Sequence, residues 1–504
     1  MTVFNKKITQ FGYILLKKQF SDNEIIQIKN DLTIKPFKMG NYKKFSKQDD
    51  NFSIYLENDD YICVPKYYGL NKFGKPDINK LELHHLPKTN IDYIGKLRPN
   101  QEIIVNKIIN GFDEKNGGIL IAGCGSGKTN MAIYIASYYK LKTLFIVHKK
   151  FLKNQVIDRI KSVTNITNVG IIQGNKIDID KPFVVGMVQS LCKMKYDPKI
   201  FKDFGLIIID EVHHMGAKNF SKAYQVMSAK YMLGISAERT RNDGTYKLIN
   251  WYMGPILHME EQKPNNMVIV KKFNYKTSNT ERIKYIENKY TNEPNRAKMI
   301  NNLILIKKRN RFILKIIEEL HAQGKNILCL TSRLRQVKKF YKLLNENLYI
   351  RGNIGKYIGS MSENELKQSA TKQIIIGTYE MAQEGLDIDN LNVVILCTPK
   401  SSIKQSVGRI LRKEIYEEHP LVIDFNDFEN KTFKRQSIKR DIYYVKQHYH
   451  IQKFNVSDFK NLNYNDWDDE KFIRDAICKQ KDQIENKIQQ KNDDELGKIE
   501  FLSD

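Results

Sequence analysis

Short apolar runs separated by longer amphipathic stretches recur along most of the chain. Between residues 96 and 265, continuous apolar runs predict strands at 119–121, 144–147, 183–185, 206–209 and 231–235. Apolar runs without polar alternation are typical of parallel strands that helices cover on both faces. A second series repeats the pattern at 327–330, 374–376, 393–396 and 421–423. The sequence therefore predicts an α/β fold with two tandem, doubly wound parallel-sheet domains.

The remaining segments lack this regular alternation. Residues 1–95 carry short β-type runs at 52–56 and 61–64 among turn signals, which predicts a small α+β domain. The boundaries that we expect are 1–95 for this accessory domain, 96–265 for the first α/β domain, 266–299 for a polar connector, 300–430 for the second α/β domain and 431–504 for a helical, basic and charged tail. Ligands of doubly wound sheets bind at the carboxyl ends of the strands, so chemistry is expected in the two α/β domains.

A glycine-rich loop lies between the apolar run 118–121 and a helix that is expected from about residue 130. The loop consists of Ala122, Gly123, Cys124, Gly125, Ser126, Gly127, Lys128 and Thr129. Glycines leave backbone N–H groups free to converge on phosphate oxygens at a helix N-terminus. Lys128 can reach the β- and γ-phosphates, and the Thr129 hydroxyl can hold Mg²⁺. The strict pattern has Gly where this chain has Ala122, so the loop matches a relaxed phosphate-binding motif. It predicts binding of a nucleoside triphosphate with Mg²⁺.

An acidic box follows the apolar run 206–209. Its residues are Asp210, Glu211, Val212, His213 and His214. A carboxylate at the carboxyl end of a parallel strand is placed to hold Mg²⁺, which we assign to Asp210, and Glu211 can polarise the attacking water as general base. We expect His213 to relay between the nucleotide and a second substrate. An ordinary acidic turn is the alternative, and the phosphate loop upstream argues against it.

A third cluster contains Gln405, Arg409 and Arg412. Helical spacing of i and i+3 would place the two arginines on one helix face. Planar guanidinium groups suit phosphate geometry, and a γ-phosphate clamp of this kind accelerates hydrolysis about 10³- to 10⁵-fold. Because these residues lie in the second α/β domain, ATP is expected to bind between the two domains and to drive a motor cycle.

Composition adds a weaker indication of a polyanionic partner. The 504 residues carry a formal net charge of +26, with 83 Lys and Arg against 57 Asp and Glu. Only 16 of the basic residues are Arg, and the abundance of Lys, Asn, Ile and Tyr is what an A/T-rich coding sequence produces. The six cysteines form no C-x-x-C pair, which argues against a disulfide framework and a structural zinc site. No apolar run approaches the roughly 20 residues of a membrane span, so a cytoplasmic or nuclear-type compartment is expected.

These motifs, in this order, resemble those of superfamily 2 helicases with a D-E-x-H box, over roughly residues 96 to 430. Beside the phosphate loop and the acidic box, the resemblance rests on segments 97–101, 145–155, 188–191, 236–244, 377–378 and 384–387. It implies two RecA-like domains. Two positions depart from the family: His148 stands where proline is usual, and Glu238 stands where threonine is usual in the element that couples hydrolysis to unwinding.

The resemblance also implies roles for individual residues. It implies ATP contacts from Arg98, Gln101 and Asp387 beside the phosphate loop, coupling through His213, Ser236 and Ala237, nucleic-acid contacts from His148, Lys149, Gln155, Gln189, Ser190, Thr378 and Gly385, and catalysis through Lys128, Asp210, Glu211, Gln405, Arg409 and Arg412. The expected activity is that of an ATP-driven helicase or translocase on nucleic acid.

Within the superfamily, the start at 98–101, the segment from Arg241 to Gly244 and the pair Gly254-Pro255 look most like the DNA-translocating branch. The segment 64–69, the size and the composition resemble the transcript-release helicases of poxviruses and their relatives in other large DNA viruses. This implies DNA as the track, 3′-to-5′ movement and a role in viral transcription or DNA processing, in the host cytoplasm, the virus factory or the virion. A duplex translocase or remodelling ATPase without strand separation, an RNA helicase and the motor subunit of a restriction system remain alternatives.

Overall fold

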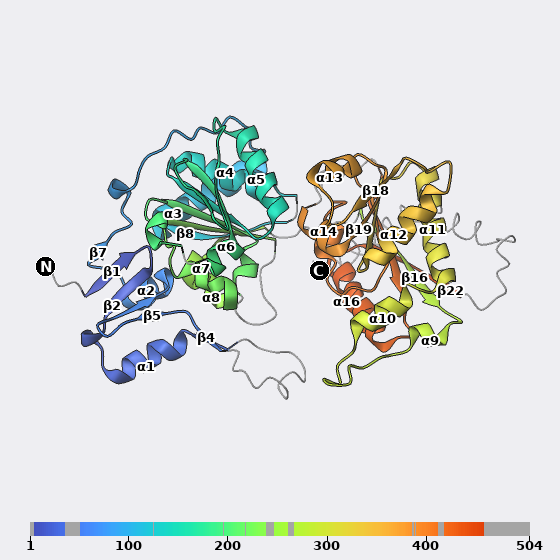
Figure 1. Ribbon diagram of the computed structural model, residues 1–504, viewed down its shortest axis with the longest axis horizontal. Helices are drawn as coiled ribbons and strands as arrows, with labels where there is room; N and C mark the ends of the chain where they lie inside the picture. Colours follow the sequence, from blue (N-terminus) through green and yellow to red (C-terminus); the bar gives the residue numbers. More distant parts are fainter. Residues whose placement is uncertain are drawn as a thin grey trace, which may run out of the picture. The chain divides into compact units, whose positions relative to one another are not determined.

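The computed structural model describes residues 5–35, 51–123, 125–194, 196–216, 218–237, 246–260, 267–385, 388, 390–411 and 418–457. The chain divides into two compact units, Met1–Gln262 and Lys263–Asp504, which we call the N-terminal and C-terminal units (Figure 1). Within the described part of the chain, no helix is long and apolar enough to cross a membrane.

The first part of the N-terminal unit is a small mixed domain, which we call the accessory domain. Its five-stranded sheet has the order β5-β6-β2-β1-β7, and β1 pairs with β2 antiparallel but with β7 parallel. The elements are β1 (Lys6–Thr9), β2 (Gly12–Leu16), α1 (Asp22–Asp31), β5 (Leu56–Glu57), β6 (Tyr61–Val64), α2 (Lys66–Phe73) and β7 (Ile78–Asn79). Helix α2 lies directly on the sheet, because Gly69 has no side chain: a Cβ there would lie 2.3 Å from Cγ of Tyr13.

The second part of the N-terminal unit is an eight-stranded sheet of order β11-β10-β12-β9-β13-β14-β8-β15. All neighbouring strands are parallel except β10 and β11. The strands are β8 (Gly117–Ile121), β9 (Thr143–Val147), β10 (Gly170–Gln173), β11 (Lys176–Asp178), β12 (Phe183–Met187), β13 (Leu206–Asp210), β14 (Tyr231–Ser236) and β15 (Ile256–Met259). The five expected strands are confirmed as β8, β9, β12, β13 and β14.

Helices cover both faces of this sheet, as expected for buried parallel strands. Helices α3 (Pro99–Lys115), α4 (Lys128–Tyr139) and α5 (Lys150–Val163) share one apolar cluster with the strands. Helices α6 (Val188–Lys193), α7 (Lys218–Tyr224) and α8 (Tyr246–Met253) contribute to a second cluster, which also contains the accessory-domain core (Figure 1). The accessory domain and this sheet therefore share one continuous core.

Polar contacts also hold the accessory domain against the amino ends of two sheet strands. The buried Nζ of Lys66 donates to the carbonyls of Ala229 and Lys230, at 3.0 and 2.8 Å, just before β14. The hydroxyl of Tyr67 donates to the carbonyl of Asn116, at 2.6 Å, just before β8. Both contacts lie at the end of the sheet opposite to the phosphate loop, which follows the carboxyl end of β8.

The C-terminal unit contains a seven-stranded sheet of order β18-β19-β17-β20-β21-β16-β22, in which all neighbouring strands are parallel. The strands are β16 (Ile269–Lys276), β17 (Ile327–Thr331), β18 (Ile354–Tyr357), β19 (Ile374–Thr378), β20 (Val393–Leu396), β21 (Leu421–Asn426) and β22 (His450–Ser457). Helices α11 (Lys307–Ala322) and α12 (Leu334–Asn345) cover one face, and α14 (Tyr379–Gly385) and α16 (Lys431–Lys446) pack on the other. The expected second α/β domain is confirmed, so both units contain a RecA-like parallel sheet.

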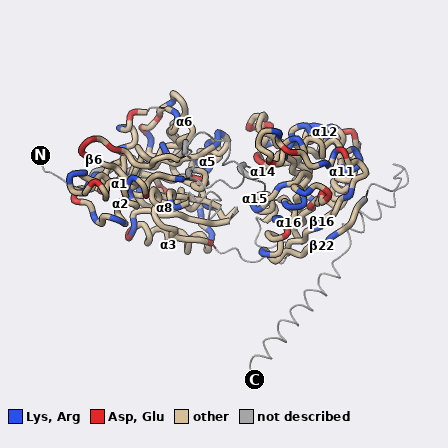
Figure 2. The backbone as a smooth tube through the Cα atoms, turned by 90° about the horizontal axis from the view of Figure 1, so that it is seen from below, with Lys and Arg blue, Asp and Glu red and all other residues tan. Residues whose placement is uncertain are grey.

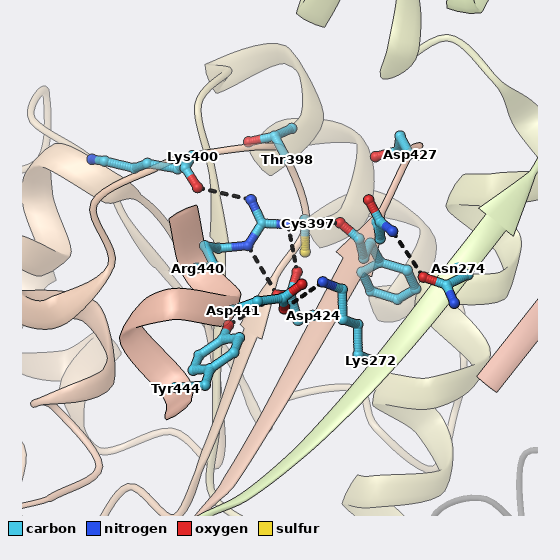
Figure 3. A network of polar contacts seen from close by, with 12 residues as sticks. Lys272, Asn274, Cys397, Thr398, Lys400, Asp424, Asp427, Arg440, Asp441 and Tyr444 are labelled. Carbon is cyan, nitrogen blue, oxygen red and sulfur yellow. Dashed lines mark hydrogen bonds and ion pairs between the residues drawn. The ribbon is translucent and has the colours of Figure 1, made fainter. Parts of the chain in front are cut away.

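Two segments differ from their expected roles. The expected connector, 266–299, contributes β16 to the interior of the sheet, where it pairs with both β21 and β22. The expected helical tail does begin with α16, but it then contributes the edge strand β22. The strand β16 was not predicted because Lys271 and Lys272 interrupt its apolar sequence pattern. Both lysines are almost fully buried, and Lys272 forms an ion pair with Asp441 on α16 (Figure 3).

A buried ion pair connects α16 with β21, and the same arginine holds the loop that follows β20 (Figure 3). The guanidinium of Arg440 on α16 donates to both oxygens of Asp424, at 2.7 and 2.9 Å, and to the carbonyl of Lys400, at 2.8 Å. The hydroxyl of Tyr444 donates to the same carboxylate. Lys400 lies in the loop that leads to the expected Gln405 cluster, so this network holds the segment that directly precedes that cluster.

Candidate active site

The carboxyl ends of three adjacent strands bring the predicted chemistry together. Strands β13, β14 and β8 are neighbours in the sheet, with Asp210 opposite Ile235 and Ser236 opposite Ile121. The phosphate loop follows β8, the acidic box follows β13, and the expected coupling element follows β14. These motifs, separated by up to about 110 residues in the chain, therefore share one edge of the sheet.

The phosphate loop is closed on itself by hydrogen bonds. Gly125 and Gly127 adopt φ values of +82° and +81°, which residues with a Cβ rarely adopt. The ammonium of Lys128, at the first turn of α4, donates to the carbonyls of Ala122 and Gly123, at 3.0 and 2.8 Å. Both acceptors are neutral, so the ammonium charge remains available to a phosphate. Thr129 follows it on α4, and Cys124 lies outside the described residues.

Gln101 contacts the phosphate loop from α3. Its Nε2 donates to the carbonyl of Ser126, at 2.9 Å, and its Oε1 accepts the backbone N–H of Arg98, at 3.0 Å. A Cβ at Gly127 would lie 2.2 Å from Nε2 of Gln101, so this contact also requires glycine. Gln101, which was expected to contact ATP, therefore also supports the loop that is expected to bind the phosphates.

A second brace was not expected from the sequence. The backbone N–H of Gly123 donates to Oε2 of Glu260, at 2.7 Å. Glu260 follows the edge strand β15, and its own N–H donates to the carbonyl of Ile121. No linear motif marks this glutamate, because the contact arises only from the pairing of β15 with β8.

The acidic box turns sharply after β13. Glu211 has a φ of +47°, a left-handed conformation that costs a non-glycine residue of order 1 kcal/mol and recurs at active sites. Nδ1 of His213 lies 3.2 Å from Oε2 of Glu211 and 2.9 Å from the hydroxyl of Ser236. The imidazole therefore joins the expected general base to the end of β14.

The two carboxyl groups of this box have opposite electrostatic environments. Burial, and then repulsion by Glu211, raise the pKa of Asp210 above its ordinary value. Burial also opposes ionisation of Glu211, but the hydrogen bond with His213, the charge of Lys128 and the neighbouring imidazoles outweigh it and lower its pKa. Glu211 is therefore the ionised partner of the pair and has the protonation state of a general base.

The residues at this edge suit Mg²⁺ in its usual form, bound to substrate phosphates. Asp210 is a partly buried carboxyl group whose ionisation a nearby cation would favour, and the Thr129 hydroxyl adds an oxygen donor. Mg²⁺ prefers oxygen ligands and commonly combines one or two carboxylates with phosphates and water. No cluster of three or more His, Cys, Asp or Glu suited to a metal ion occurs in the parts of the chain that the structure describes.

A row of three imidazoles extends from the acidic box toward the expected nucleic-acid contacts. The ring centroids of His213 and His214 are 4.1 Å apart, and those of His214 and His148 are 4.7 Å apart. Burial lowers the pKa of His148 to about 4, so its ring is neutral. The side-chain amide of Gln189 donates to the carbonyl of His148. The structure thus brings the loops after β9 and β12, which carry the two expected contact motifs, into contact beside the acidic box.

The other expected contact residues of the N-terminal unit lie at the starts of two helices. Lys149 directly precedes α5, and Gln155 is exposed on that helix. The hydroxyl of Ser190, on α6, accepts the N–H of Gly174, at 2.9 Å. Ala237 follows β14 and is buried. Gln155 is thus exposed and Lys149 partly exposed, and the hydroxyl of Ser190 takes part in a contact within the fold.

In the C-terminal unit, the expected residues that the structure describes lie at one strand end, in two short helices and just after the second of these helices. Thr378 ends β19, and its hydroxyl accepts the N–H of Met381, while Gly385 ends α14. Gln405 lies in the short helix α15 (Lys404–Val407), which ends before Arg409. The prediction of one helix face for Arg409 and Arg412 is not confirmed, because α15 has its C-cap at Gly408 and Arg412 lies outside the described residues. Asp387, Glu238, Arg241, Asp243 and Gly244 also lie outside them.

Two family models match the chain. The model described as type III restriction enzyme, res subunit, matches residues 94–241, and the model described as helicase conserved C-terminal domain matches residues 308–414. The first match contains the phosphate loop and the acidic box, and the second contains Thr378, Gln405 and Arg409.

Several known proteins are similar in sequence. A putative ATP-dependent RNA helicase of Acanthamoeba polyphaga mimivirus is 60% identical over 473 residues, which are 94% of this chain and 91% of that protein. A putative ATP-dependent RNA helicase of African swine fever virus is 26% identical over 66% of this chain and 69% of that protein. A DNA 3′-5′ translocase of Sulfurisphaera tokodaii is 30% identical over 28% of this chain and 31% of that protein.

The two domain matches and the viral relative, which aligns over nearly the full length, identify the same family of proteins. The common position of the phosphate loop and the acidic box at one edge of the sheet is consistent with that family. The chain belongs to the superfamily 2 helicases of large DNA viruses, ATP-hydrolysing enzymes that act on nucleic acid.

Proposed function

We propose that ATP is hydrolysed at the shared carboxyl edge of β8, β13 and β14. The backbone of the phosphate loop and Lys128 would bind the triphosphate, and Glu211 would accept a proton from the attacking water. Mg²⁺, when bound with ATP, would neutralise charge on the phosphates, with Asp210 and Thr129 as its protein ligands. The observation that carries this assignment is the position of Glu211, whose carboxylate lies 3.2 Å from Nδ1 of His213 at the same end of the sheet as the phosphate loop.

The assignment of the remaining ATP contacts comes from the resemblance. Arg98 and Gln101 would contact the base, and Gly123, Cys124, Gly125, Ser126 and Gly127 would surround the phosphates. From the C-terminal unit, Asp387 would contact ATP, and Gln405, Arg409 and Arg412 would support catalysis. Arginine in this role stabilises negative charge on the transferring phosphoryl group, so substitution should lower turnover far more than ATP affinity.

DNA is our proposed track, with 3′-to-5′ movement. The contacts would come from His148, Lys149, Gln155, Gln189, Ser190, Thr378 and Gly385, and they would hold phosphates without reading bases. Basic residues recur in both units, as Figure 2 shows, which favours a polyanionic partner. The match to a protein named a DNA 3′-5′ translocase supports this choice.

RNA is the second candidate track. The relatives in mimivirus and African swine fever virus are named RNA helicases, and the first of them covers nearly the whole chain. A third reading, a duplex translocase or remodelling ATPase that does not separate strands, is motivated by Glu238 in the coupling element. We place the enzyme in viral transcription, in transcript release, or in viral DNA processing within the infected cell.

The decisive experiment compares ATPase rates with single-stranded DNA, duplex DNA and RNA. We expect strong stimulation by DNA, and steeply weaker binding as salt rises. Stimulation by RNA alone would overturn the DNA track. A displaced-strand assay beside a triplex-displacement assay then separates a helicase from a duplex translocase. Lys128→Ala is the reference variant: it should abolish hydrolysis and leave nucleic-acid affinity largely intact, and retained hydrolysis would refute the site.

A further inference from the structure

The backbone between Ala122 and Gly123 is held from two opposite sides. Its carbonyl, on Ala122, accepts a hydrogen bond from the ammonium of Lys128, at 3.0 Å. Its N–H, on Gly123, donates to the carboxylate of Glu260, at 2.7 Å. A trans peptide unit is planar and points its C=O and N–H in opposite directions. Lys128 and Glu260 therefore face each other across a single peptide group.

The carboxylate, the peptide group and the ammonium form a row of two hydrogen bonds with opposite charges at its ends. A carboxylate at the N–H and an ammonium at the C=O polarise the peptide in the same sense, and hydrogen bonds in such chains strengthen one another. Hydrogen bonds that involve a charged group are also the shorter and stronger ones. The orientation of this peptide therefore depends on the carboxylate of Glu260 as much as on the lysine.

Glu260 is itself held firmly enough to act as a support. It directly follows β15, whose last residue, Met259, lies opposite Ile121 in the pairing with β8. The N–H of Glu260 donates to the carbonyl of Ile121, at 2.8 Å. The carboxylate is thus carried by the edge strand next to β8, where the phosphate loop begins.

We infer that Glu260 is a positioning residue for the phosphate loop, which fixes the Ala122–Gly123 peptide while Lys128 transfers from loop carbonyls to the phosphates of ATP. This inference rests on the proposed function of the loop. Lys128 must leave the carbonyls of Ala122 and Gly123 to reach a phosphate. Without Glu260, the peptide would lose its remaining charged contact at that moment, and part of the energy of ATP binding would be spent on ordering the loop.

The experiment compares Glu260→Ala with Glu260→Gln. The glutamine retains a side-chain carbonyl acceptor but loses the charge, whereas alanine loses both. We expect Glu260→Ala to raise the KM for ATP and the Kd for ADP about 10- to 100-fold, the range that the loss of one hydrogen bond to a charged group gives. The kcat at saturating ATP should change far less, because Glu260 touches no reacting atom. Glu260→Gln should recover only part of the affinity, because it keeps an acceptor for the Gly123 N–H but lacks the charge.

A matched control is Glu114→Ala, which removes an exposed carboxylate from α3. It should leave the KM unchanged. Thermal unfolding of each variant identifies any loss of affinity that reflects a damaged fold. If both Glu260 variants bind ATP more tightly than the unaltered protein, the carboxylate merely repels the triphosphate and the inference is wrong. Unchanged affinity in Glu260→Ala also refutes it.

The outcome can be separated from that of the proposed function. If Lys128→Ala abolishes hydrolysis and Glu260→Ala behaves like the unaltered protein, the ATP site stands and only the role of Glu260 fails. If Lys128→Ala retains hydrolysis, the phosphate loop is not the catalytic site and both proposals fail.

Discussion

Nδ1 of His213 lies 2.9 Å from the hydroxyl of Ser236. The same nitrogen lies 3.2 Å from the carboxylate of Glu211. One imidazole therefore contacts both the expected general base, at the end of β13, and the first residue of the expected coupling element, at the end of β14. A shift of either strand end would therefore alter the contact of the imidazole with the residue at the other strand end.

Glu211→Gln should abolish turnover while ATP still binds. The amide has nearly the shape of the carboxylate but cannot accept the proton, and loss of a general base lowers rates about 10²- to 10⁴-fold. Steady-state ATPase and ATP binding, measured on the same preparation, check this prediction. Near-normal turnover would show that another group is the base.

Ser236→Ala should separate hydrolysis from movement. The variant removes the hydroxyl that contacts His213 but keeps the hydrogen-bonding of Glu211 with the imidazole. We expect ATPase activity to fall only severalfold, while the strand displaced, or the distance moved, per ATP falls more strongly. Equal losses in both quantities would contradict a coupling role for this contact.

Asp424→Asn should destabilise the C-terminal unit. The change leaves the guanidinium of Arg440 buried without its counter-charge, and breaking a buried ion pair in this way costs about 3–5 kcal/mol. Denaturant unfolding measures the loss. The exposed pair Lys284–Glu281 supplies the control, because Glu281→Gln should change stability by less than about 1 kcal/mol. Equal changes in the unfolding free energy for the two variants would mean that the buried Arg440–Asp424 pair contributes no more to stability than the exposed pair.

Lys66 should make folding stability depend on pH. Burial, and then repulsion by Lys230, lower its pKa from 10.5 to about 7 in the folded protein. Between these values the unfolded chain binds a proton at Lys66 that the folded chain does not, so stability should rise with pH, by at most about 1.4 kcal/mol per pH unit. Below pH 7 both states are protonated and this contribution to the slope vanishes.

Comparison of variants isolates the contribution of this lysine. Unfolding free energies at pH 7.5 and 9.5 should rise less for Lys66→Met than for the unaltered protein. The exposed Lys80, replaced in the same way, should leave the pH dependence as it was. A slope that Lys66→Met leaves intact would show that Lys66 stays charged when buried.

The sequence predicted those features whose signal is local. The strand β13 and the acidic box lie in one unbroken segment, as do β8 and the phosphate loop, so the five expected strands and the position of these motifs at strand ends followed from pattern and spacing. The shared edge followed from the rule that doubly wound sheets bind ligands at their carboxyl ends.

Features that depend on pairing between distant segments could not be predicted. The apolar sequence pattern of β16 is interrupted by Lys271 and Lys272, and the ion pair with the distant Asp441 explains how Lys272 is accommodated there. Glu260 contacts Gly123, which lies 137 positions earlier in the chain, because β15 pairs with β8. The helix expected through Arg412 did not account for Gly408, which caps α15 immediately after Val407.

The attachment of the accessory domain bears on how the enzyme can be divided. A fragment that starts at residue 96 would retain the whole phosphate loop and the acidic box, yet it would lose Lys66 and Tyr67. The carbonyls of Asn116, Ala229 and Lys230 would lose these donors, and the apolar surface around Tyr252 and Met253 would lose its cover. Such a fragment should aggregate, so we expect that a stable fragment with the ATP site must include the accessory domain.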